Sequence, residues 1–324
     1  MNHPSKESPL STSYPAARLD EAIGLGLDAG GTQTRWALAA ADGRILAEGH
    51  VGPLNALQTA TPAGRDLWRA TLLELAAQLK GHGHAMPRAV HAGLTGYGGT
   101  MAEPVELITA ALQIDRGAVA ASNDVEVAYR DVFALGAGHL VYAGTGAIAV
   151  HVDARGHCHR AGGLGGVLDD AGGGYWIGRE ALKRIWRAED EEPGAWHRSA
   201  LAMALMQRMG GSDWACTRAF LATADRGAMG ALALIVAQVA DRDEVAMDIL
   251  EQAGRELARL GCILLRRLGP LPIALVGRVW QLHPAIGQTC REALPADTRV
   301  TVCECRGHHA AARLAASRLT TGSI

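Results

Sequence analysis

The sequence predicts an α/β protein built from two similar halves. The first observation is a repeat of one pattern at residues 24–49 and 139–163: an apolar strand, a turn of glycine and threonine, a second strand, an Asp-containing reversal and a third strand. The second is that short apolar runs alternate with longer segments of helical periodicity along the chain. The third is the length of 324 residues, which suggests two domains and allows a substantial core.

The composition is that of an ordinary globular protein. The formal net charge is −2 and hydrophobic residues make up 48% of the chain, so bulk charge gives no reason to expect nucleic-acid binding. No apolar run reaches the roughly 18 residues of a membrane-spanning helix. Residues 1–22 are polar and lack an apolar segment, so we expect a disordered tail rather than a signal peptide. Six scattered cysteines suggest reduced thiols in a cytoplasmic protein.

The first turn follows the strand that ends at Asp28. Glycines let the backbone approach a ligand closely, and backbone N–H groups and threonine hydroxyls are donors for phosphate oxygens. The Asp28 carboxylate repels phosphate but can hold Mg²⁺, usually through waters, and the metal can bridge to the phosphates. The candidate phosphate contacts are Gly30, Gly31, Thr32 and Thr34.

This turn also resembles two other nucleotide-binding motifs, and it has one purely structural alternative. Residues 24–29 satisfy the dinucleotide pattern G-x-G-x-x-A, but that pattern needs a helix directly after the turn, and here a strand leads to the reversal at Asp42-Gly43. A Walker loop fails because no Gly-Lys-Ser/Thr follows. A purely structural hairpin turn remains the alternative to a phosphate loop.

The other helices and strands are predicted from the periodicity of apolar residues, and their ends from the positions of Gly, Pro and Asp. In the long helix 244–268 the apolar stripe is core packing rather than a cofactor site. The other expected helices cover about 65–80, 104–113, 125–133, 200–209, 213–223, 228–240, 284–293 and 308–317, and the other expected strands about 88–94, 118–121, 272–277 and 298–305.

Asp124 stands between a strand and a helix, as the sequence Ser122-Asn123-Asp124 shows. Ligands gather at the carboxyl ends of strands in parallel or mixed sheets, which favours a functional carboxylate. An aspartate there is also an excellent helix N-cap. Both interpretations stay open at this point.

The second half offers a matching turn and a glycine-rich loop. Gly144, Thr145 and Gly146 follow the strand 139–143, and two such turns make a natural clamp for a polyphosphate. The loop 162–174 can fold tightly around a ligand, with Asp169 and Asp170 as acceptors for hydroxyls; a mobile linker is the alternative. The helix that starts at Tyr175 favours an ordered loop.

Two groups of metal-ligand residue types lack a zinc-binding spacing, which disfavours a metal site at either. They are Cys303 and Cys305 with His308 and His309, and the run His157-Cys158-His159. Whether the first group binds a metal stays open at this point.

Five ordered motifs together resemble the N-acetylglucosamine kinases of the BadF/BadG/BcrA/BcrD-type ATPase family, within the sugar kinase, actin and heat-shock chaperone superfamily. The resemblance implies two ribonuclease-H-like (actin-like ATPase) domains, residues 23–135 and 136–324, the second with a helical insertion, and a nucleotide and sugar cleft between them. The motifs are residues 27–32, 123–124, 143–146, 162–176 and 275–280.

The resemblance also implies roles for particular residues. Asp124 aligns with the catalytic base, Asp28 would lie near Mg²⁺, and Gly277 would approach the adenosine of ATP. Gly30, Gly31, Thr32 and Thr34 would form the first phosphate loop and Gly144, Thr145 and Gly146 the second, while Asn55, Gly163 and Asp170 align with sugar-contacting positions. A homodimer is expected by the same resemblance.

The expected activity is transfer of the γ-phosphate of ATP to the 6-hydroxyl of N-acetylglucosamine, with Mg²⁺. Glucosamine, N-acetylmuramic acid and glucose remain alternative acceptors, because Leu164 replaces a family tryptophan and residues 169–173 lack the family's Gly-Asp-Glu-Gly-Ser run. An ATPase that activates a radical dehydratase would need cysteines placed to ligate an iron–sulfur cluster. A sugar-sensing transcriptional regulator would need a helix-turn-helix module. Neither feature is found.

Overall fold

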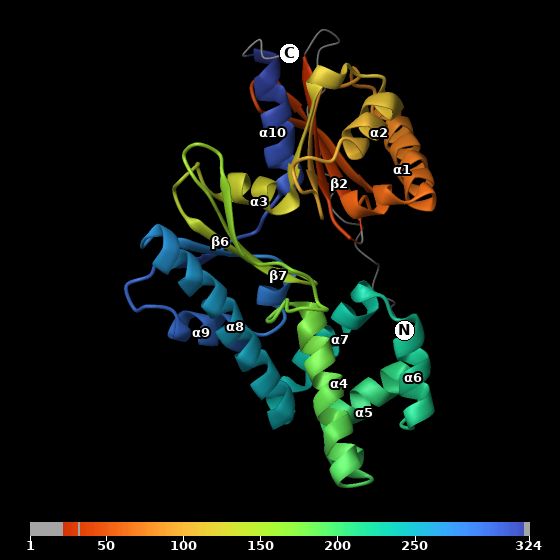
Figure 1. Ribbon diagram of the computed structural model, residues 1–324, viewed down its shortest axis with the longest axis vertical. Helices are drawn as coiled ribbons and strands as arrows, with labels where there is room; N and C mark the ends of the chain where they lie inside the picture. Colours follow the sequence, from red (N-terminus) through yellow and green to blue (C-terminus); the bar gives the residue numbers. More distant parts are fainter. Residues whose placement is uncertain (1–21, 32, 321–324) are drawn as a thin grey trace, which may run out of the picture. The chain divides into compact units, whose positions relative to one another are not determined.

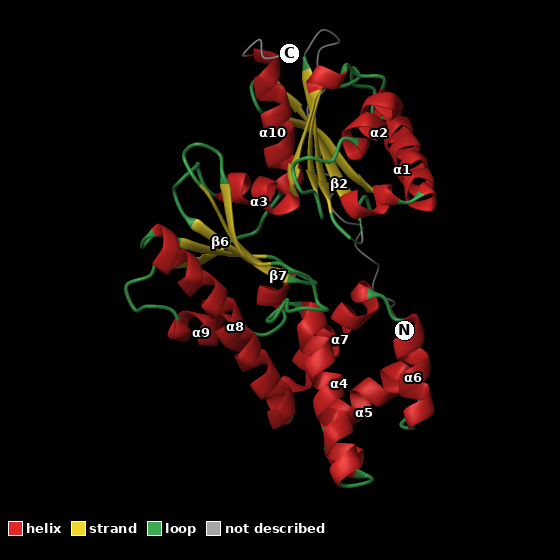
Figure 2. Cartoon of the chain, viewed as in Figure 1, coloured by secondary structure: helices red, strands yellow, loops and turns green. Residues whose placement is uncertain are grey.

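The computed structural model describes residues 22–31 and 33–320, and these fall into two compact units. Unit 1 contains the residues up to Val127 together with those from Gly307 onward, and unit 2 contains residues 128–306. Both units are α/β, as the sequence predicts (Figure 2). Within the described ranges, no helix is long and apolar enough to cross a membrane.

Unit 1 is built on a five-stranded sheet with the order β3-β2-β1-β4-β5. β1, β2 and β3 form an antiparallel meander, in which the reversal at Asp42-Gly43 joins β2 to β3 and Gly43 has a φ of +83°. β4 and β5 are parallel to β1, so the carboxyl ends of all three lie at one edge. The strands are β1 (Ile23–Ala29), β2 (Thr34–Ala40), β3 (Ile45–Val51), β4 (Ala89–Leu94) and β5 (Val119–Asn123).

Helices cover both faces of this sheet (Figure 1). α1 (Pro62–Gly81) and α2 (Glu103–Leu112) bury Trp68 and Ile108 against one face. α1 begins where the Thr61 hydroxyl accepts a hydrogen bond from Gly64 N and Pro62 occupies the first turn, a strong start signal. α10 (Gly307–Thr320) covers the other face.

The two faces of β1 carry different residue types. Leu25 and Leu27 point into the core under α1 and α2. Gly24 and Gly26 face α10, whose backbone lies so close that a Cβ on Gly26 would stand 2.0 Å from Ala312 N and one on Gly24 2.3 Å from Ala316 N. The glycines that mimic a dinucleotide motif therefore serve helix-on-sheet packing.

Unit 2 repeats the topology of unit 1. Its five-stranded sheet has the order β10-β9-β6-β7-β8, again with a three-stranded antiparallel meander followed by two parallel strands. The predicted internal repeat is thus confirmed at the level of strand pairing. The strands are β6 (His139–Ala143), β7 (Ala147–Val152), β8 (Cys158–Gly162), β9 (Ile273–Val276) and β10 (Val300–Val302).

Between β8 and β9 lies a helical region that supplies most of the core of unit 2. α8 packs on β6, β7 and β8, and α4 packs on α7. Aspartate side chains start α6, α7 and α8 by accepting a backbone N–H of the first turn. The helices are α4 (Gly174–Glu191), α5 (Ala200–Met209), α6 (Trp214–Thr223), α7 (Arg226–Val239), α8 (Glu244–Leu268) and α9 (Pro284–Ala293), with α3 (Asp124–Val132) leading from unit 1 into unit 2.

Short 3-10 helices connect these elements, and one of them, η1, carries a predicted site residue as its N-cap. They are η1 (Ala56–Ala60), η2 (Arg116–Ala118), η3 (Ala195–Arg198), η4 (Ala240–Arg242) and η5 (Arg278–Gln281).

The structure corrects the expected division of the chain. Residues 136–324 were expected to form one domain, but α10 packs on β1, β2 and β4 of unit 1 because its small side chains fit against Gly24 and Gly26. The other division falls at Val127, inside α3, rather than at residue 135. The last strand is shorter than the expected 298–305. The expected disordered tail falls on residues 1–21, outside the described ranges, and residue 22 is the first described.

We expect Gly26→Ala to destabilise the protein. The added Cβ would meet the backbone of α10, which cannot move aside as a flexible side chain can, so the free energy of unfolding should fall by roughly 1–3 kcal/mol or more. Urea unfolding followed by circular dichroism measures the change. Gly81→Ala is the control, because a Cβ there meets nothing within 4 Å at the end of α1. Equal stability of the two variants would contradict the close packing of α10.

Candidate functional site

Polar side chains gather where β1, β4 and β5 of unit 1 end. Asp28 is the next-to-last residue of β1, Thr95 follows β4, and Asp124 follows β5. The parallel register aligns Ala29 with Leu94 and Leu94 with Asn123, so these residues lie along one edge of the sheet. Ligands bind at such carboxyl-terminal edges in α/β sheets.

Asp124 is held by hydrogen bonds from two sides. The Thr95 hydroxyl lies 2.5 Å from Asp124 Oδ2 and 2.8 Å from the Ala29 carbonyl oxygen, and Val125 N donates to Asp124 Oδ1 at 2.9 Å. Asp124 is half-buried and is the first residue of α3, so it partly satisfies the helix start. The N-cap position belongs to Asn123, whose Oδ1 also accepts from Val125 N at 3.2 Å, so capping does not require the Asp124 carboxylate.

Thr95 is a site residue that the sequence reasoning missed. It stands directly after a buried strand and before Gly96, which has a φ of +77°. A hydroxyl at the end of a parallel strand, followed by glycine, was the available signal. Only the sheet register places Thr95 beside Asp124.

Asp28 lies against the start of α10. A Cβ on Gly307, the first residue of that helix, would stand 2.9 Å from a carboxylate oxygen of Asp28. The positive end of the helix dipole favours a negative charge there. Glycine at position 307 thus leaves room for the Asp28 carboxylate beside the helix N-terminus.

The structure describes the first glycine turn apart from residue 32. Gly30 N donates to Gln33 O at 3.0 Å, and a Cβ on Gly31 would meet open space. Thr34 is fully buried, and its hydroxyl has no hydrogen-bond partner among the described residues. Thr32, a predicted phosphate contact, lies outside the described residues.

Asn55 is placed next to the same edge of unit 1. It pairs with Thr95 in an isolated β-bridge and caps η1, accepting from Leu57 N at 2.9 Å while Gln58 Oε1 accepts from Asn55 N at 3.2 Å. Trp68 Nε1 donates to the Asn55 carbonyl at 3.0 Å. These bonds hold Asn55 close to Thr95. Two predicted site residues, Asn55 and Asp124, therefore both lie next to Thr95.

In unit 2 the second glycine turn is tied to the start of α4. Gly174 N donates to Gly144 O at 2.8 Å and Tyr175 N to Thr145 O at 2.9 Å. Gly173 is needed at this point, because a Cβ there would lie 2.7 Å from the backbone of Gly146. The turn is therefore fixed by backbone contacts, as an ordered glycine loop requires.

Asp170 is buried beside this turn and is not a free acceptor. Arg226 Nη2 lies 2.5 Å from Asp170 Oδ2, and Gly165 N donates to Oδ1 at 3.3 Å. Burial raises the pKa of Asp170, and the Arg226 charge opposes that rise. Asp169 pairs with Arg259. In this structure both carboxylates hold the loop, and their role as acceptors for hydroxyls stays a prediction.

Arg226 is the second missed residue. It is the first residue of α7 and lies 56 positions from Asp170 in sequence, so no local pattern connects them.

Glycines at two other predicted positions are explained by packing. Gly277 has a φ of +107°, and a Cβ there would lie 2.3 Å from Ala143 O, at the ends of β9 and β6. Gly163 has a φ of +74°, and a Cβ there would lie 2.5 Å from Ile148 Cδ1. Their predicted contacts with adenosine and sugar stay predictions.

The loop between β8 and α4 also carries apolar side chains that face solvent. Leu164 is 72% exposed, Val167 99% and Leu168 70%, within five residues of chain. An apolar surface on a glycine-rich loop is suited to contact with a ligand or partner.

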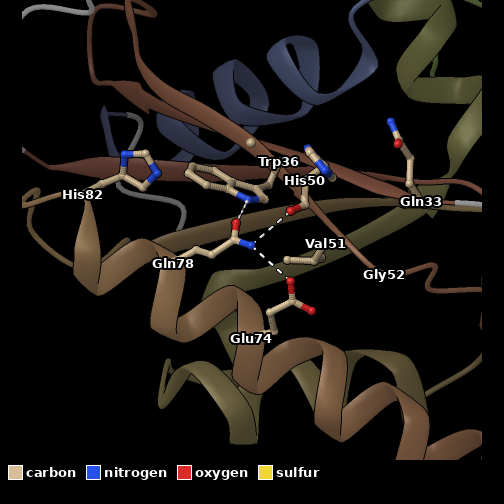
Figure 3. A pocket seen from close by; sticks show the side chains of 9 residues that line it. Gln33, Trp36, His50, Val51, Gly52, Glu74, Gln78 and His82 are labelled. Atoms are coloured by element: carbon tan, nitrogen blue, oxygen red, sulfur yellow. Dashed lines mark hydrogen bonds between the residues drawn. The ribbon is translucent and has the colours of Figure 1, made fainter.

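A pocket of about 510 Å³ lies in unit 1 between β3 and α1 (Figure 3). Gln78 organises its wall: Trp36 Nε1 donates to Gln78 Oε1 at 2.9 Å, and Gln78 Nε2 donates to the His50 carbonyl at 3.1 Å and to Glu74 at 3.2 Å. Gln33 of the first glycine turn also lines it, whereas Asp28 and Asp124 do not.

The donor set at the edge of unit 1 fits a hard cation. Mg²⁺ in phosphate-transfer sites takes one or two carboxylates together with phosphate oxygens. Asp28 offers a half-buried carboxylate at the end of β1, next to a glycine turn whose Gly31 leaves open space.

Similarity to known proteins identifies the family of this chain. Residues 25–293 match the model of the BadF/BadG/BcrA/BcrD ATPase family. The chain belongs to this family. A curated relative, the N-acetylmuramic acid/N-acetylglucosamine kinase of Clostridium acetobutylicum, is 26% identical over 169 residues, which are 52% of this chain and 54% of the relative. The match thus spans about half the length of that protein.

Solved structures confirm the fold prediction of two ribonuclease-H-like halves. A candidate N-acetylglucosamine kinase from Chromobacterium violaceum superposes with a TM-score of 0.71 at 27% identity, over 91% of this chain and 99% of that one. A candidate N-acetylglucosamine kinase from Porphyromonas gingivalis gives 0.70 at 17% identity, over 93% and 99%. The ROK family glucokinase of Streptomyces griseus, solved with glucose and AMPPNP, gives 0.57 at 17% identity, over 92% and 98%.

We expect Arg226→Met to destabilise unit 2 in a pH-dependent way. The change leaves the Asp170 carboxylate buried without its cationic partner, so the free energy of unfolding should fall by about 2 kcal/mol at neutral pH. The loss is less than for a fully buried pair because Arg226 is 57% exposed.

The sign of the pH dependence follows from the raised pKa of Asp170. At pH values between the carboxyl pKa of the unfolded chain and the higher pKa of folded Asp170, the folded protein binds more protons than the unfolded chain. The free energy of unfolding therefore falls as the pH rises through this range. Removing Arg226 raises the folded pKa further, so the deficit should shrink as pH is lowered. Urea unfolding at about pH 8 and about pH 5 tests this. Arg69→Met, which breaks the exposed pair with Asp66, is the control. A pH-independent deficit would refute the assignment.

Proposed function

We propose that this protein is an ATP-dependent sugar kinase that transfers the γ-phosphoryl group to a hydroxyl of an amino sugar. The observation that carries the proposal is the Asp124 carboxylate, held by Thr95 at the end of β5, in a chain of an ATPase family. The 6-hydroxyl of N-acetylglucosamine is the acceptor we propose. Glucosamine, N-acetylmuramic acid and glucose are the alternatives.

The role of Asp124 is that of general base. Phosphoryl transfer is mostly positioning and charge stabilisation, and the protein must also take the proton of the attacking hydroxyl. A carboxylate fixed by the Thr95 hydroxyl on one oxygen and by Val125 N on the other presents a defined lone pair to that proton. Thr95 acts as a positioning residue, because it touches Asp124.

The phosphates of ATP are assigned to backbone donors. In unit 1 the turn at Gly30 and Gly31 offers N–H groups, with Thr32 and Thr34 as predicted hydroxyl contacts. In unit 2 the turn of Gly144, Thr145 and Gly146 is assigned the same role, and Gly277 is assigned to adenosine. Asp28 would hold Mg²⁺, which supplies charge neutralisation at the phosphates when bound.

The sugar class is supported by the relatives' printed activities. The Clostridium acetobutylicum relative is a kinase of N-acetylmuramic acid and N-acetylglucosamine. Asn55, Gly163 and Asp170 are the proposed sugar positions. Because Arg226 pairs with Asp170, we infer that Asp170 positions the loop as well. The exposed Leu164 in the same loop is suited to an apolar substituent of the sugar. A homodimer and a cytoplasmic location, the latter from six free cysteines, belong to the same proposal.

The deciding experiment is ATP consumption with Mg²⁺ in the presence of single sugars. The panel contains N-acetylglucosamine, glucosamine, N-acetylmuramic acid, glucose and buffer alone. We expect strong stimulation by N-acetylglucosamine, with the product identified by mass spectrometry and its phosphate position by NMR. ATP hydrolysis that no sugar stimulates would overturn the kinase proposal. Stimulation by another sugar alone would keep the kinase and change its acceptor.

We expect Asp124→Asn to lower kcat by about 10²–10⁴-fold while nucleotide affinity changes little, because the amide cannot take the hydroxyl proton. Turnover and equilibrium nucleotide binding measure the two effects. Asp115→Asn is the matched control, since Asp115 caps η2 on the surface.

Thr95→Val should lower kcat more than it changes KM, and Thr95→Ser should restore most of the loss. An active Asp124→Asn enzyme would reduce Asp124 to a helix cap.

A further inference from the structure

A compact group of metal-ligand side chains lies in unit 1, apart from the residues assigned above. Glu48 projects from the edge strand β3, and His308 and His309 belong to the first turn of α10. His308 Nε2 lies 3.1 Å and His309 Nε2 2.5 Å from the same oxygen, Glu48 Oε2. The three ligand atoms all lie within 4.8 Å of one another.

The packing of α10 explains why these residues meet although about 260 positions separate them. Glu48 pairs with Ala37 across β2 and β3, and Ala37 packs under Ala312 of α10, so Glu48 is on the face that α10 covers. The start of α10 therefore stands over the edge of the sheet. The two imidazole rings are 4.4 Å apart between centroids.

The group is buried on the histidine side and open on the carboxylate side. His308 and His309 are each 6% exposed, whereas the Glu48 side chain is 34% exposed. Imidazole nitrogen and carboxylate oxygen are both common ligand atoms for divalent transition metals.

The hydrogen-bonding pattern leaves one polar atom unused. His308 Nδ1 is buried and has no hydrogen-bond partner among the described residues. This atom lacks a partner whichever ring nitrogen carries the proton, so it does not by itself distinguish a hydrogen-bonded group from a metal site. With both Nε2 atoms directed at a cation, the two imidazoles and the carboxylate share one positive centre.

We propose that Glu48, His308 and His309 bind a divalent transition metal, with Zn²⁺ as the best match. A tetrahedral ion with bonds of about 2.0–2.1 Å holds its ligand atoms about 3.3–3.4 Å apart. His308 Nε2 lies 3.1 Å from Glu48 Oε2, near that value, whereas His309 Nε2, at 2.5 Å, would have to move away from the carboxylate by somewhat less than 1 Å to admit the ion. Imidazole nitrogen with carboxylate suits Zn²⁺ and disfavours Mg²⁺, which prefers oxygen. Water supplies the fourth position on the open side of Glu48.

The charges that face this group come from three elements. Glu48 contributes from β3, Arg35 from β2 opposes a cation and also lowers the pKa of His308, and Asp28 from β1 lies beside Gly307 at the start of α10. Asp28 and Arg35 carry opposite charges at paired positions of β1 and β2. The bound ion joins β3 to α10, so its effect is to fix the closing helix on the edge of the sheet.

The test uses the full chain without a histidine tag, stripped with a chelator and dialysed. Calorimetric titration with ZnCl2 should show one Zn²⁺ per chain, and MgCl2 at the same concentration should not compete. The melting temperature should rise on Zn²⁺ addition, because binding to the folded state stabilises it. Co²⁺ in place of Zn²⁺ should give the intense visible absorption of a tetrahedral site. This last readout needs no variant and no enzymatic activity.

Variants locate the site. His309→Gln and Glu48→Gln should each weaken Zn²⁺ binding by at least about 10-fold and abolish the Co²⁺ absorption. His157→Gln is the matched control, because His157 and His159 both lie 3.3 Å from Asp153 Oδ2 in a more exposed group of the same composition. Circular dichroism checks that each variant folds.

Two results would overturn the proposal: no stoichiometric Zn²⁺ binding to the unaltered chain, or binding that His157→Gln removes and the other two variants leave intact.

Discussion

The close contact between β1 and α10 is the constraint on which unit 1 depends. Gly24 and Gly26 place no side chain between the strand and the helix. The helix residues that pack against them, Ala312 and Ala316, are also small. Helix and sheet therefore meet backbone to backbone, which few residue pairs allow. Because β1 is the central strand, its two faces must serve different partners: glycine against α10, and large apolar side chains against the core under α1 and α2.

This contact also sets the chemistry at the start of α10. Gly307 lies beside the Asp28 carboxylate, and the next two residues, His308 and His309, reach Glu48. Two negatively charged side chains of the sheet thus meet the positive end of one helix. The carboxyl ends of β4 and β5 add Thr95 and Asp124 at the same edge of the sheet. One helix docking thereby affects both the proposed phosphate chemistry and the proposed metal site.

In unit 2 a buried carboxylate, that of Asp170, holds the glycine-rich loop in place. Asp170 adopts a φ of +55°, a left-handed conformation that Asp tolerates better than most residues, and its carboxylate lies under the second glycine turn. Arg226 supplies the compensating charge from α7. The glycine-rich loop is therefore ordered by an ion pair and by hydrogen bonds, while its apolar residues Leu164 and Val167 face solvent. The order and the exposure together suit a loop that meets a ligand.

The sequence by itself determined the fold class, the internal repeat and nearly every helix, because these depend on local periodicity and capping: the long helix 244–268 and the helix 284–293 are observed with those bounds. It also singled out Asp28 and Asp124, since a carboxylate after a buried strand is a local signal. The tertiary structure alone decided that the last helix belongs to unit 1, that Gly24 and Gly26 serve packing, and that Thr95, Arg226 and Glu48 have partners far along the chain. Such pairings depend on strand register and helix docking, which bring together residues that no local pattern connects.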